Sequence, residues 1–155
     1  MNLFAYGTLM SPEGFRQALG DRASTLRYRM ARLSGWRRVW NAYREEWGGG
    51  VLNIEPSAGA TVVGVLIEGL TADEFARMDA QEATHLPRDT VFVEQAVGEP
   101  VPAQVYWRRR GNHLGKPAPG YLAVVLERAR QAGPEVFENL RTDSVDSSGR
   151  PLDLA

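Results

Sequence analysis

Segments with the pattern of β-strands outnumber segments with the pattern of α-helices in this chain, and the two kinds do not alternate regularly. The order is roughly one strand, a helix, four strands, a helix, two strands and a helix, with further helix at the end. A parallel sheet with helices on both faces is built from strands and helices in strict alternation. The order therefore predicts an α+β fold with a curved or closed sheet.

The expected strands are short runs of apolar or alternating residues bounded by glycine, proline or serine. They lie at residues 3–6, in two pieces of 25–40 that a bend at Ser34-Gly35 separates, at 51–56 and 62–70 with a turn between them, and at 88–95 and 102–108. The triple glycine at 48–50 precedes one of these strands. No Lys-Ser or Lys-Thr pair follows it, which excludes a phosphate-binding P-loop and favours a turn or bulge.

The expected helices begin at recognisable caps. Ser11 and Pro12 are typical of an N-cap and a first helical residue, and the helix that they begin is expected to reach residue 20. Thr71 and Glu74 match a capping box, which predicts a helix ending at 81–82. Further helices are expected at 119–132 and after Pro134, and the polar segment 141–155 is expected to be a loosely held tail.

Length and charge limit the possible classes of protein. At 155 residues, the chain is long enough for one domain with a substantial core and too short for two domains that each have one. Eighteen Lys and Arg against 19 Asp and Glu leave a formal net charge of −1. This balance supplies no broad attraction to nucleic acid or to an anionic membrane, so neither is expected as a partner.

The absence of cysteine removes several kinds of chemistry. Without it the chain has no disulfide framework, no thiolate nucleophile and no thiolate metal site. The opening MNLFAYGTLM lacks the basic segment of a secretory signal, and no later apolar run approaches the roughly 20 residues of a membrane-spanning helix. These features predict a cytoplasmic protein.

The sequence Tyr6-Gly7-Thr8 marks a bend between the first strand and the first helix. It has two interpretations that the local pattern leaves open. Glycine is the usual residue where a chain leaves a sheet, so the bend can be an ordinary turn. A strand-to-helix loop also exposes several backbone N–H groups near one point, and these can hold an anion or a developing oxyanion.

Histidine and arginine provide only minor candidates for a site. His85 and His113 fall on expected loops and match no metal-ligand spacing, so surface positions are expected for both, and no metal site is expected. The run Arg108, Arg109 and Arg110 lies at the end of an expected strand. It is either a solvated face or a group that grips a carboxylate.

Acidic residues remain as the candidates for catalysis. Asp79 and Glu82 are three residues apart on one side of a helix end. A carboxylate near a helix C-terminus faces the negative end of the helix dipole, which is unfavourable unless another group holds it. The spacing alone leaves a functional and an incidental role equally open.

Four segments together resemble the γ-glutamylcyclotransferase-like family, which includes γ-glutamylamine cyclotransferases and plant avirulence-induced proteins. They are FAYGTL near the start, GGGVLNIEPS in the middle, GVLIEGLTADEFARMDAQE, and PAPGYLAVVLERARQAG near the end. The resemblance covers residues 1–140, which are expected to form one domain followed by the tail at 141–155. It implies a mixed, barrel-like sheet with flanking helices.

The resemblance also implies an activity: closure of the γ-glutamyl group of a small substrate to 5-oxoproline, with release of the attached amine or amino acid. No cofactor is implied. Glu82 matches the general base of the family, and the loop residues Tyr6, Gly7, Thr8 and Leu9 match its substrate-binding loop. Tyr121 matches a tyrosine that borders the pocket.

One departure from the family pattern concerns the amine side of the substrate. Many relatives place a tyrosine soon after the glutamate, whereas this chain has none between Glu82 and Val91. The sequence names neither the leaving group nor the oligomeric state. A non-catalytic module that binds a γ-glutamyl metabolite on the same fold is the alternative, because a fold alone does not determine function.

Overall fold

A mixed six-stranded sheet forms the centre of the protein, whose computed structural model describes residues 1–152 and Leu154. The strands are β1 (Leu3–Ala5), β2 (Arg27–Arg44), β3 (Gly49–Glu68), β4 (Asp89–Val93), β5 (Val101–Val105) and β6 (Val145–Asp146). Their order across the sheet is β4-β5-β1-β3-β2-β6. β1 pairs with β5 and β2 pairs with β6 in parallel, and the other neighbours are antiparallel.

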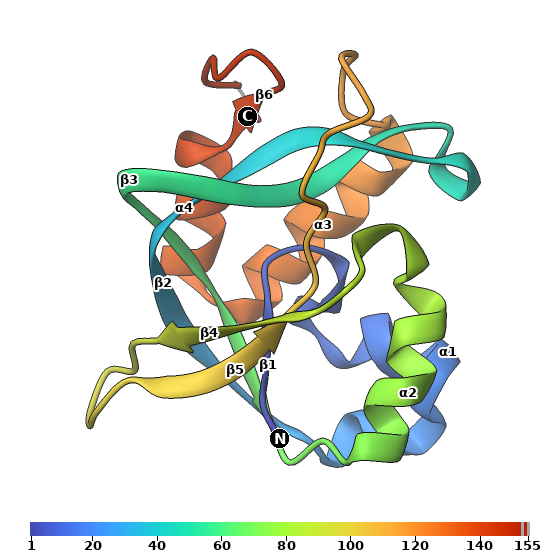
Figure 1. The fold of residues 1–155 in the computed structure, drawn as a ribbon, viewed down its shortest axis with the longest axis vertical. Helices are drawn as coiled ribbons and strands as arrows, with labels where there is room; N and C mark the ends of the chain where they lie inside the picture. Colours follow the sequence, from blue (N-terminus) through green and yellow to red (C-terminus); the bar gives the residue numbers. More distant parts are fainter. Residues whose placement is uncertain (153, 155) are drawn as a thin grey trace.

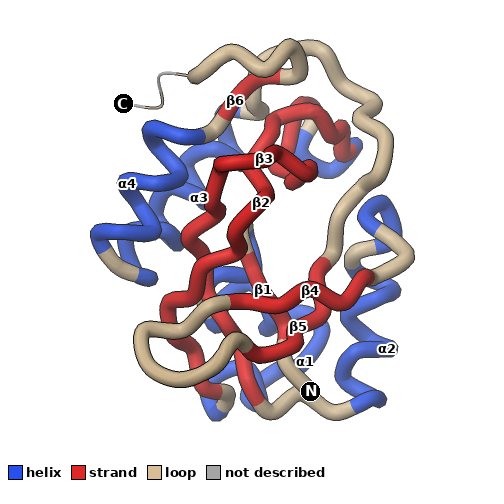
Figure 2. The backbone as a smooth tube through the Cα atoms, turned by 60° about the vertical axis from the view of Figure 1, so that its left-hand side comes forward, coloured by secondary structure: helices blue, strands red, loops and turns tan. Residues whose placement is uncertain are grey.

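The sheet curls until one end of the strand order approaches the other. Glu94, directly after β4, exchanges two backbone hydrogen bonds with Arg32 of β2, at 3.0 and 2.8 Å. β4 is therefore tied to β5 on one side and to β2 through this bridge. Figure 2 shows β4 and β5 crossing beside the long paired ribbon of β2 and β3. The predicted α+β fold with a mixed, barrel-like sheet is confirmed.

The prediction of four short strands between residues 25 and 70 was wrong, because two long strands, β2 and β3, occupy this region. The predicted bend at Ser34-Gly35 lies at a shift in the register of β2 and β3, where Gly35 has φ +85° and the extra residues belong to β3. The predicted turn at 56–59 lies opposite it inside β3, since Pro56 pairs with Trp36 and Thr61 pairs with Ser34. Both strands bend together here and keep the same partner on either side, so the ribbon continues.

Four helices flank the sheet: α1 (Arg16–Leu19), α2 (Ala72–Gln81), α3 (Pro119–Ala132) and α4 (Pro134–Asp143). Short 3-10 turns lie at Thr8–Met10, Pro12–Phe15, Gly20–Thr25, Glu45–Trp47 and Ala83–His85. The predicted helix at 11–20 is divided into a 3-10 turn and the single α-turn of α1. Within the part of the chain that the structure describes, no helix is long and apolar enough to cross a membrane.

The start of α2 has the predicted capping box. The Thr71 hydroxyl accepts the Glu74 N–H at 3.2 Å, and the Glu74 carboxylate accepts the Thr71 N–H at 3.0 Å. Phe75 and Met78 then bury the inner face of the helix. These contacts fix the direction in which α2 delivers its last turn, where Glu82 is the C-cap.

The helices form two groups around the sheet. α3 and α4 pack against each other and against β3, whereas α1 and α2 lie together beside the end where β1 begins (Figure 1). The core fills the curl of the sheet, and Phe4, Trp40 and Leu66 are among its fully buried members. Because β1 passes through the middle of this core, the loop that follows it emerges between the two helix groups.

The segment 141–155 differs in part from the expected loosely held tail. Its first residues complete α4, β6 then pairs in parallel with Val39 and Trp40 of β2, and a bridge joins Val145 to Pro151. Leu154 is buried against the core. The expectation for positions 153 and 155 lies outside the described residues.

Candidate active site

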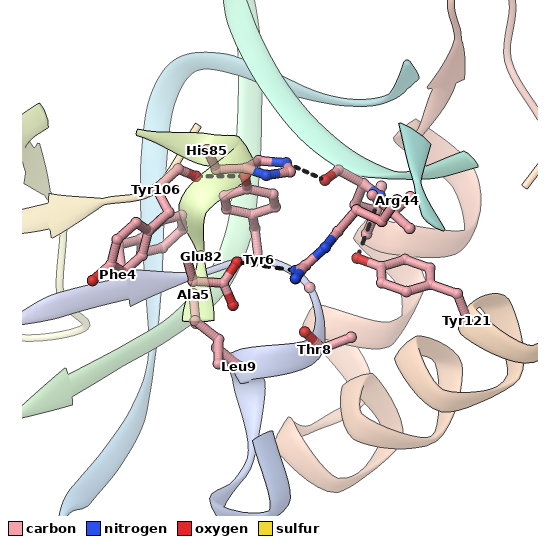
Figure 3. A pocket seen from close by; sticks show the side chains of 13 residues that line it. Phe4, Ala5, Tyr6, Thr8, Leu9, Arg44, Glu82, His85, Tyr106 and Tyr121 are labelled. Carbon is pink, nitrogen blue, oxygen red and sulfur yellow. Dashed lines mark hydrogen bonds and ion pairs between the residues drawn. The ribbon is translucent and has the colours of Figure 1, made fainter. Parts of the chain in front are cut away.

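A cavity opens where the loop after β1 meets the ends of β2, α2, β5 and the start of α3 (Figure 3). Its space, including the part open to solvent, is about 430 Å³. The lining residues are Phe4, Ala5, Tyr6, Gly7, Thr8, Leu9, Arg44, Val51, Leu52, Glu82, His85, Tyr106 and Tyr121. All six residues that the family resemblance nominated for the site lie among them.

The loop Tyr6–Leu9 forms one wall of the cavity. The Tyr6 side chain is buried, and its hydroxyl donates to the carbonyl oxygen of Tyr106 at 2.5 Å. Burial raises the pKa of Tyr6 well above its usual value, so the phenol stays protonated. No acceptor among the described residues receives the N–H of Gly7, Thr8 or Leu9. The loop therefore carries three backbone N–H groups that have no acceptor among the described residues, on residues that line the cavity.

Among the described residues, Glu82 brings the only carboxylate to the cavity lining. It follows the last turn of α2, donates its N–H to the Met78 carbonyl at 2.9 Å, and is 7% exposed. Burial raises the pKa of Glu82, and the nearby Arg44 guanidinium opposes that increase. The carboxyl group is therefore better able to exchange a proton near neutral pH than an exposed glutamate.

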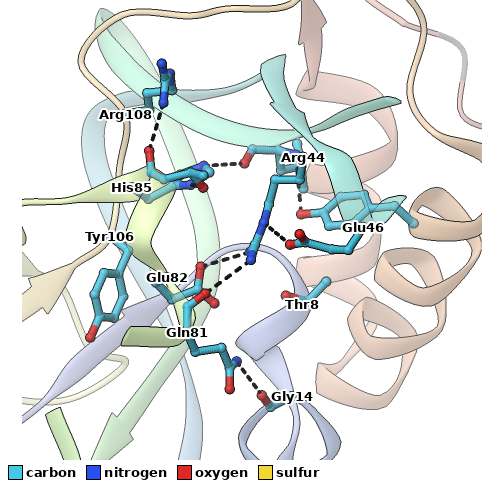
Figure 4. A network of polar contacts seen from close by, with 12 residues as sticks. Thr8, Gly14, Arg44, Glu46, Gln81, Glu82, His85, Tyr106 and Arg108 are labelled. Atoms are coloured by element: carbon cyan, nitrogen blue, oxygen red, sulfur yellow. Dashed lines mark hydrogen bonds and ion pairs between the residues drawn. The ribbon is translucent and has the colours of Figure 1, made fainter. Parts of the chain in front are cut away.

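Arg44, the last residue of β2, holds Glu82 in place (Figure 4). Its Nη1 lies 3.4 Å from the Glu82 carboxylate, and its Nη2 donates to the Gln81 carbonyl at 3.1 Å. A second carboxylate, that of Glu46, also pairs with this guanidinium. The positive charge of Arg44 therefore offsets both the negative end of the helix dipole and the carboxylate beside it. A carboxylate is unfavourable at a helix C-terminus, and this cation stabilises Glu82 there.

On the opposite wall of the cavity, the backbone of Leu52 in β3 connects Tyr121 to His85. The Leu52 N–H donates to the Tyr121 hydroxyl at 3.3 Å, and the Leu52 carbonyl accepts from His85 Nε2 at 3.2 Å. Burial raises the pKa of Tyr121 well above its usual value. Two rings, Trp40 and Trp47, contact Tyr121 edge-on and hold it against the cavity.

The expected surface position of His85 was wrong, because the side chain is only 4% exposed and lines the cavity. The turn Ala83–His85 folds back from the end of α2 and carries the ring inward. The Thr84 hydroxyl bonds Nδ1 at 2.8 Å, and burial lowers the pKa of His85 to about 4. The ring is therefore neutral at neutral pH and acts as a hydrogen-bonding part of the wall.

We expect His85 to make the protein less stable as the pH falls. Because the folded pKa of about 4 lies below the ordinary value of 6.5, the unfolded chain binds a proton that the folded protein does not. Stability from this group is complete above about pH 6.5 and is lost towards pH 4, by up to about 3 kcal/mol. Urea denaturation of wild type and His85→Gln at pH 7 and pH 4.5 measures this. An unchanged pH dependence in the variant would contradict it.

Asp79 lies outside the cavity, although it is three residues from Glu82. Its carboxylate accepts from Arg88 Nε at 2.6 Å and from the Tyr106 hydroxyl at 2.7 Å. Burial favours a higher pKa for Asp79, but these two hydrogen bonds outweigh burial and lower it. The Asp79 carboxylate therefore anchors Tyr106, whose ring forms part of the cavity wall.

The arginine run also lies away from the cavity. Arg108 donates to the Thr84 carbonyl at 3.2 Å, and Arg109 pairs with Asp89 at 2.6 Å while its guanidinium stacks on Trp107. Arg110 is exposed. Two of these side chains thus fasten the segment after α2 to the segment after β5.

The sequence pattern did not predict Arg44, His85 and Tyr106 as cavity residues. Arg44 and Tyr106 stand at or beside strand ends and His85 stands in a turn, and no local motif distinguishes them from ordinary surface residues. Their common signal is tertiary: each lies at the end of an element that reaches the loop after β1. Among the described residues, no group of three or more His, Asp or Glu side chains is placed to hold a metal ion.

Comparison with known families supports the resemblance seen in the sequence. The family model described as "Gamma-glutamyl cyclotransferase, AIG2-like" matches residues 3–124. This range contains the loop after β1, Glu82 and Tyr121. No curated protein sequence matches the chain.

Solved structures share the fold. A gamma-glutamyl cyclotransferase matches with a TM-score of 0.78 at 20% identity, over 95% of this chain and 89% of the other. An uncharacterized human protein matches with a TM-score of 0.77 at 21% identity, over 94% and 89% of the two chains. YkqA from Bacillus subtilis matches with a TM-score of 0.72 at 21% identity, over 90% of this chain and 52% of YkqA. At these identities the likeness shows a common fold alone.

Proposed function

The chain belongs to the gamma-glutamyl cyclotransferase, AIG2-like family, and from this premise we propose that it cyclises a small γ-glutamyl compound. The α-amine of the γ-glutamyl group attacks the γ-carbonyl carbon of the same group and forms the ring C–N bond. The bond from that carbon to the leaving nitrogen then breaks. The products are 5-oxoproline and a free amine or amino acid, and the reaction consumes neither water nor a cofactor.

Glu82 is the proposed general base and acid. The substrate amine is an ammonium ion at neutral pH and cannot attack until it loses a proton, which the Glu82 carboxylate accepts. The same carboxyl group then returns a proton to the leaving nitrogen. A buried carboxylate with a raised pKa, held by Arg44, suits both steps.

The loop after β1 is the proposed anion-binding element. Attack on the γ-carbonyl places negative charge on its oxygen, and backbone N–H groups aimed at that oxygen stabilise the transition state. The N–H groups of Gly7, Thr8 and Leu9, which have no acceptor among the described residues, are the proposed donors. The α-carboxylate of the substrate can use the donors that the oxyanion leaves unoccupied.

The remaining walls hold the glutamyl chain in a folded shape. Ring closure is intramolecular, so its rate depends mainly on how often the amine and the carbonyl carbon meet in the right orientation. Tyr6 and Tyr121 are buried rings with fixed hydroxyl groups, and the buried Leu9 adds apolar surface to the cavity lining. A narrow cavity with such fixed walls favours the folded chain over the extended one.

One observation carries this proposal. The carboxylate of Glu82 and the donors of the loop Tyr6–Leu9 line the same cavity, although 73 or more residues separate them in sequence (from Leu9 to Glu82). A base and an anion site in one small cavity are the two parts that the cyclisation needs.

The proposal is tested by incubating the protein with γ-glutamyl compounds and measuring 5-oxoproline by mass spectrometry. The panel contains a γ-glutamyl amino acid, a γ-glutamyl amine, glutathione and a γ-glutamyl unit on a carrier. A matching α-glutamyl compound and a protein-free sample are the negative controls. Product from at least one γ-glutamyl member, and from neither control, is the expected result.

Failure of every member to cyclise, in protein shown to be folded, would contradict the proposal. If one member binds without being cyclised, the protein is a γ-glutamyl-metabolite binding module. The panel also identifies the leaving group, which bears on the missing tyrosine after Glu82.

The pH dependence of turnover should report on Glu82. Because the base must be ionised, kcat/KM falls on the acid side at the pKa of Glu82, which lies above its usual value of 4.5. Removing the opposing cation with Arg44→Gln should raise the pKa of Glu82 and shift this acid limb to higher pH. A pH profile of 5-oxoproline formation measures the shift.

Glu46→Gln provides a control that should shift the acid limb of the pH profile in the opposite direction. The Glu46 charge raises the pKa of Glu82, and Glu46 also shares the Arg44 guanidinium. Its removal should therefore move the acid limb to lower pH. If both variants left the limb at its wild-type position, a group other than Glu82 would control it.

A further inference from the structure

Every peptide group of the loop after β1 has its carbonyl oxygen occupied on the side away from the free N–H groups. Arg38 Nε donates to the Tyr6 carbonyl at 2.8 Å, and Arg128 Nη1 donates to the Thr8 carbonyl at 2.5 Å. The Gly7 carbonyl between them accepts the Met10 N–H at 3.2 Å. Two of the three carbonyls therefore face a guanidinium.

The geometry of the peptide bond links these carbonyls to the donors. The C=O of Tyr6 and the N–H of Gly7 belong to one planar unit, as do the C=O of Thr8 and the N–H of Leu9. In a trans peptide the two groups point in opposite directions, and the one cis bond in the described residues is Leu86-Pro87. An arginine that holds the carbonyl on one side therefore aims the N–H to the other.

The two arginines are well suited to polarise these peptides. Arg38 is only 2% exposed and also donates to the Val63 carbonyl and to Asn139, which locks it between β2, β3 and α4. Burial lowers the pKa of Arg38 to about 9, so it stays charged at neutral pH. Arg128 reaches the loop from α3, where it is half-buried.

Neither guanidinium forms a close ion pair, although the charges of Asp143 and Glu13 act from farther away on Arg38 and Arg128, respectively. Among the residues that the structure describes, no carboxylate oxygen lies within 4.0 Å of Arg38 or Arg128. A positive charge at a carbonyl oxygen increases the peptide dipole and makes the attached N–H a stronger donor, more so where the surroundings are poor in water. The positive charges of Arg38 and Arg128 therefore strengthen the N–H groups of Gly7 and Leu9 as hydrogen-bond donors.

We propose that Arg38 and Arg128 are positioning residues that aim and strengthen the N–H donors of Gly7 and Leu9 for an anion in the cavity. The identity of the anion, the α-carboxylate or the oxyanion of a γ-glutamyl substrate, rests on the function proposed above. The orientation of the donors does not, since it follows from the two hydrogen bonds to Tyr6 and Thr8.

Arg128 is the better residue to replace, because Arg38 has several buried contacts that folding needs. Arg128→Gln keeps a donor of hydrogen bonds and removes the charge, whereas Arg128→Lys keeps the charge on a different geometry. Arg130→Gln is the matched control: Arg130 lies two residues further along α3, pairs with Glu127 and stacks on Phe137, away from the loop. All variants are compared at a temperature where each is fully folded.

Two quantities are measured: kcat and KM for 5-oxoproline formation, and the Kd of 5-oxoproline itself, a small carboxylate, by calorimetry at fixed ionic strength. Arg128→Gln should lower kcat/KM by about 10- to 100-fold, as for loss of a hydrogen bond from a charged donor, and should weaken 5-oxoproline binding. Arg128→Lys should recover part of both losses. Arg130→Gln should match wild type in both.

Wild-type kinetics and wild-type binding in folded Arg128→Gln would overturn the inference while leaving the cyclisation proposal intact. A loss that Arg128→Lys fails to recover at all would also overturn it, because charge at the carbonyl would then not matter. If wild type forms no 5-oxoproline yet binds it in an Arg128-dependent way, the cyclisation proposal fails and the inference stands. A wild type that neither forms nor binds 5-oxoproline contradicts both.

Discussion

Glu82→Gln is expected to lower the rate of 5-oxoproline formation by about 100- to 10,000-fold, the usual contribution of a general base. Glutamine has nearly the shape of glutamate but accepts no proton at neutral pH, so the substrate ammonium ion would keep its proton. The fold should persist, because Arg44 still pairs with Glu46 and still donates to the Gln81 carbonyl. The rate is measured with a substrate that wild type cyclises.

Although Glu82→Gln should lower turnover, we do not expect it to lower stability. Burial disfavours the charged form of Glu82, so replacing it by a neutral amide should leave the free energy of unfolding at pH 7 unchanged or increase it. Asp73→Asn, an exposed acid in the first turn of the same helix, is the control and should keep wild-type turnover. Near-normal turnover in Glu82→Gln would refute the role of Glu82 as base.

Gly7→Ala is expected to lower turnover by about 100-fold at a temperature where the variant is folded. Gly7 has φ −136°, so alanine meets no left-handed backbone there, and we expect at most about 1 kcal/mol of lost stability. The new Cβ would lie 3.0 Å from the Tyr121 hydroxyl and 3.8 Å from Leu52, both of which line the cavity. It would therefore intrude into the substrate space or tilt the N–H donors.

The size of this effect separates the two interpretations of the bend at Tyr6-Gly7-Thr8. Loss of one oxyanion donor costs roughly 3 kcal/mol of transition-state stabilisation, well beyond the expected change in stability. Thr8→Ala leaves the backbone donors in place and should be milder. If Gly7→Ala were folded and fully active, the loop would be an ordinary turn between a strand and a helix.

Local patterns predicted the elements whose signals lie within a few residues. The capping box at Thr71 and Glu74, and the prolines at 119 and 134, marked three helix starts that the structure contains. The region 25–70 was predicted less well. Glycine and proline are typical of turns, yet Gly35 and Pro56 lie at a shift in the register of β2 and β3, and the two strands stay paired beyond it.

The residues of the candidate site also divide into those that the sequence predicted and those that it did not. The Tyr6–Leu9 loop, Glu82 and Tyr121 were nominated by a resemblance that spans most of the chain, and the structure lines one cavity with all of them. Arg44 and His85 were not nominated, and His85 was expected at the surface. Their burial depends on how the hairpin of β2 and β3 and the turn after α2 fold over the loop, and residue spacing carries no sign of that.

By itself, the sequence determined the kind of fold, the starts of its main helices and the residue types available for chemistry, because capping, turn and strand preferences act between near neighbours. Only the tertiary structure decided which charges meet. Arg38 and Arg128 reach the loop across 32 and 120 residues of sequence, and Arg44 reaches Glu82 across 38. Such contacts depend on the curl of the sheet and on the burial of charge, which are properties of the packed chain as a whole.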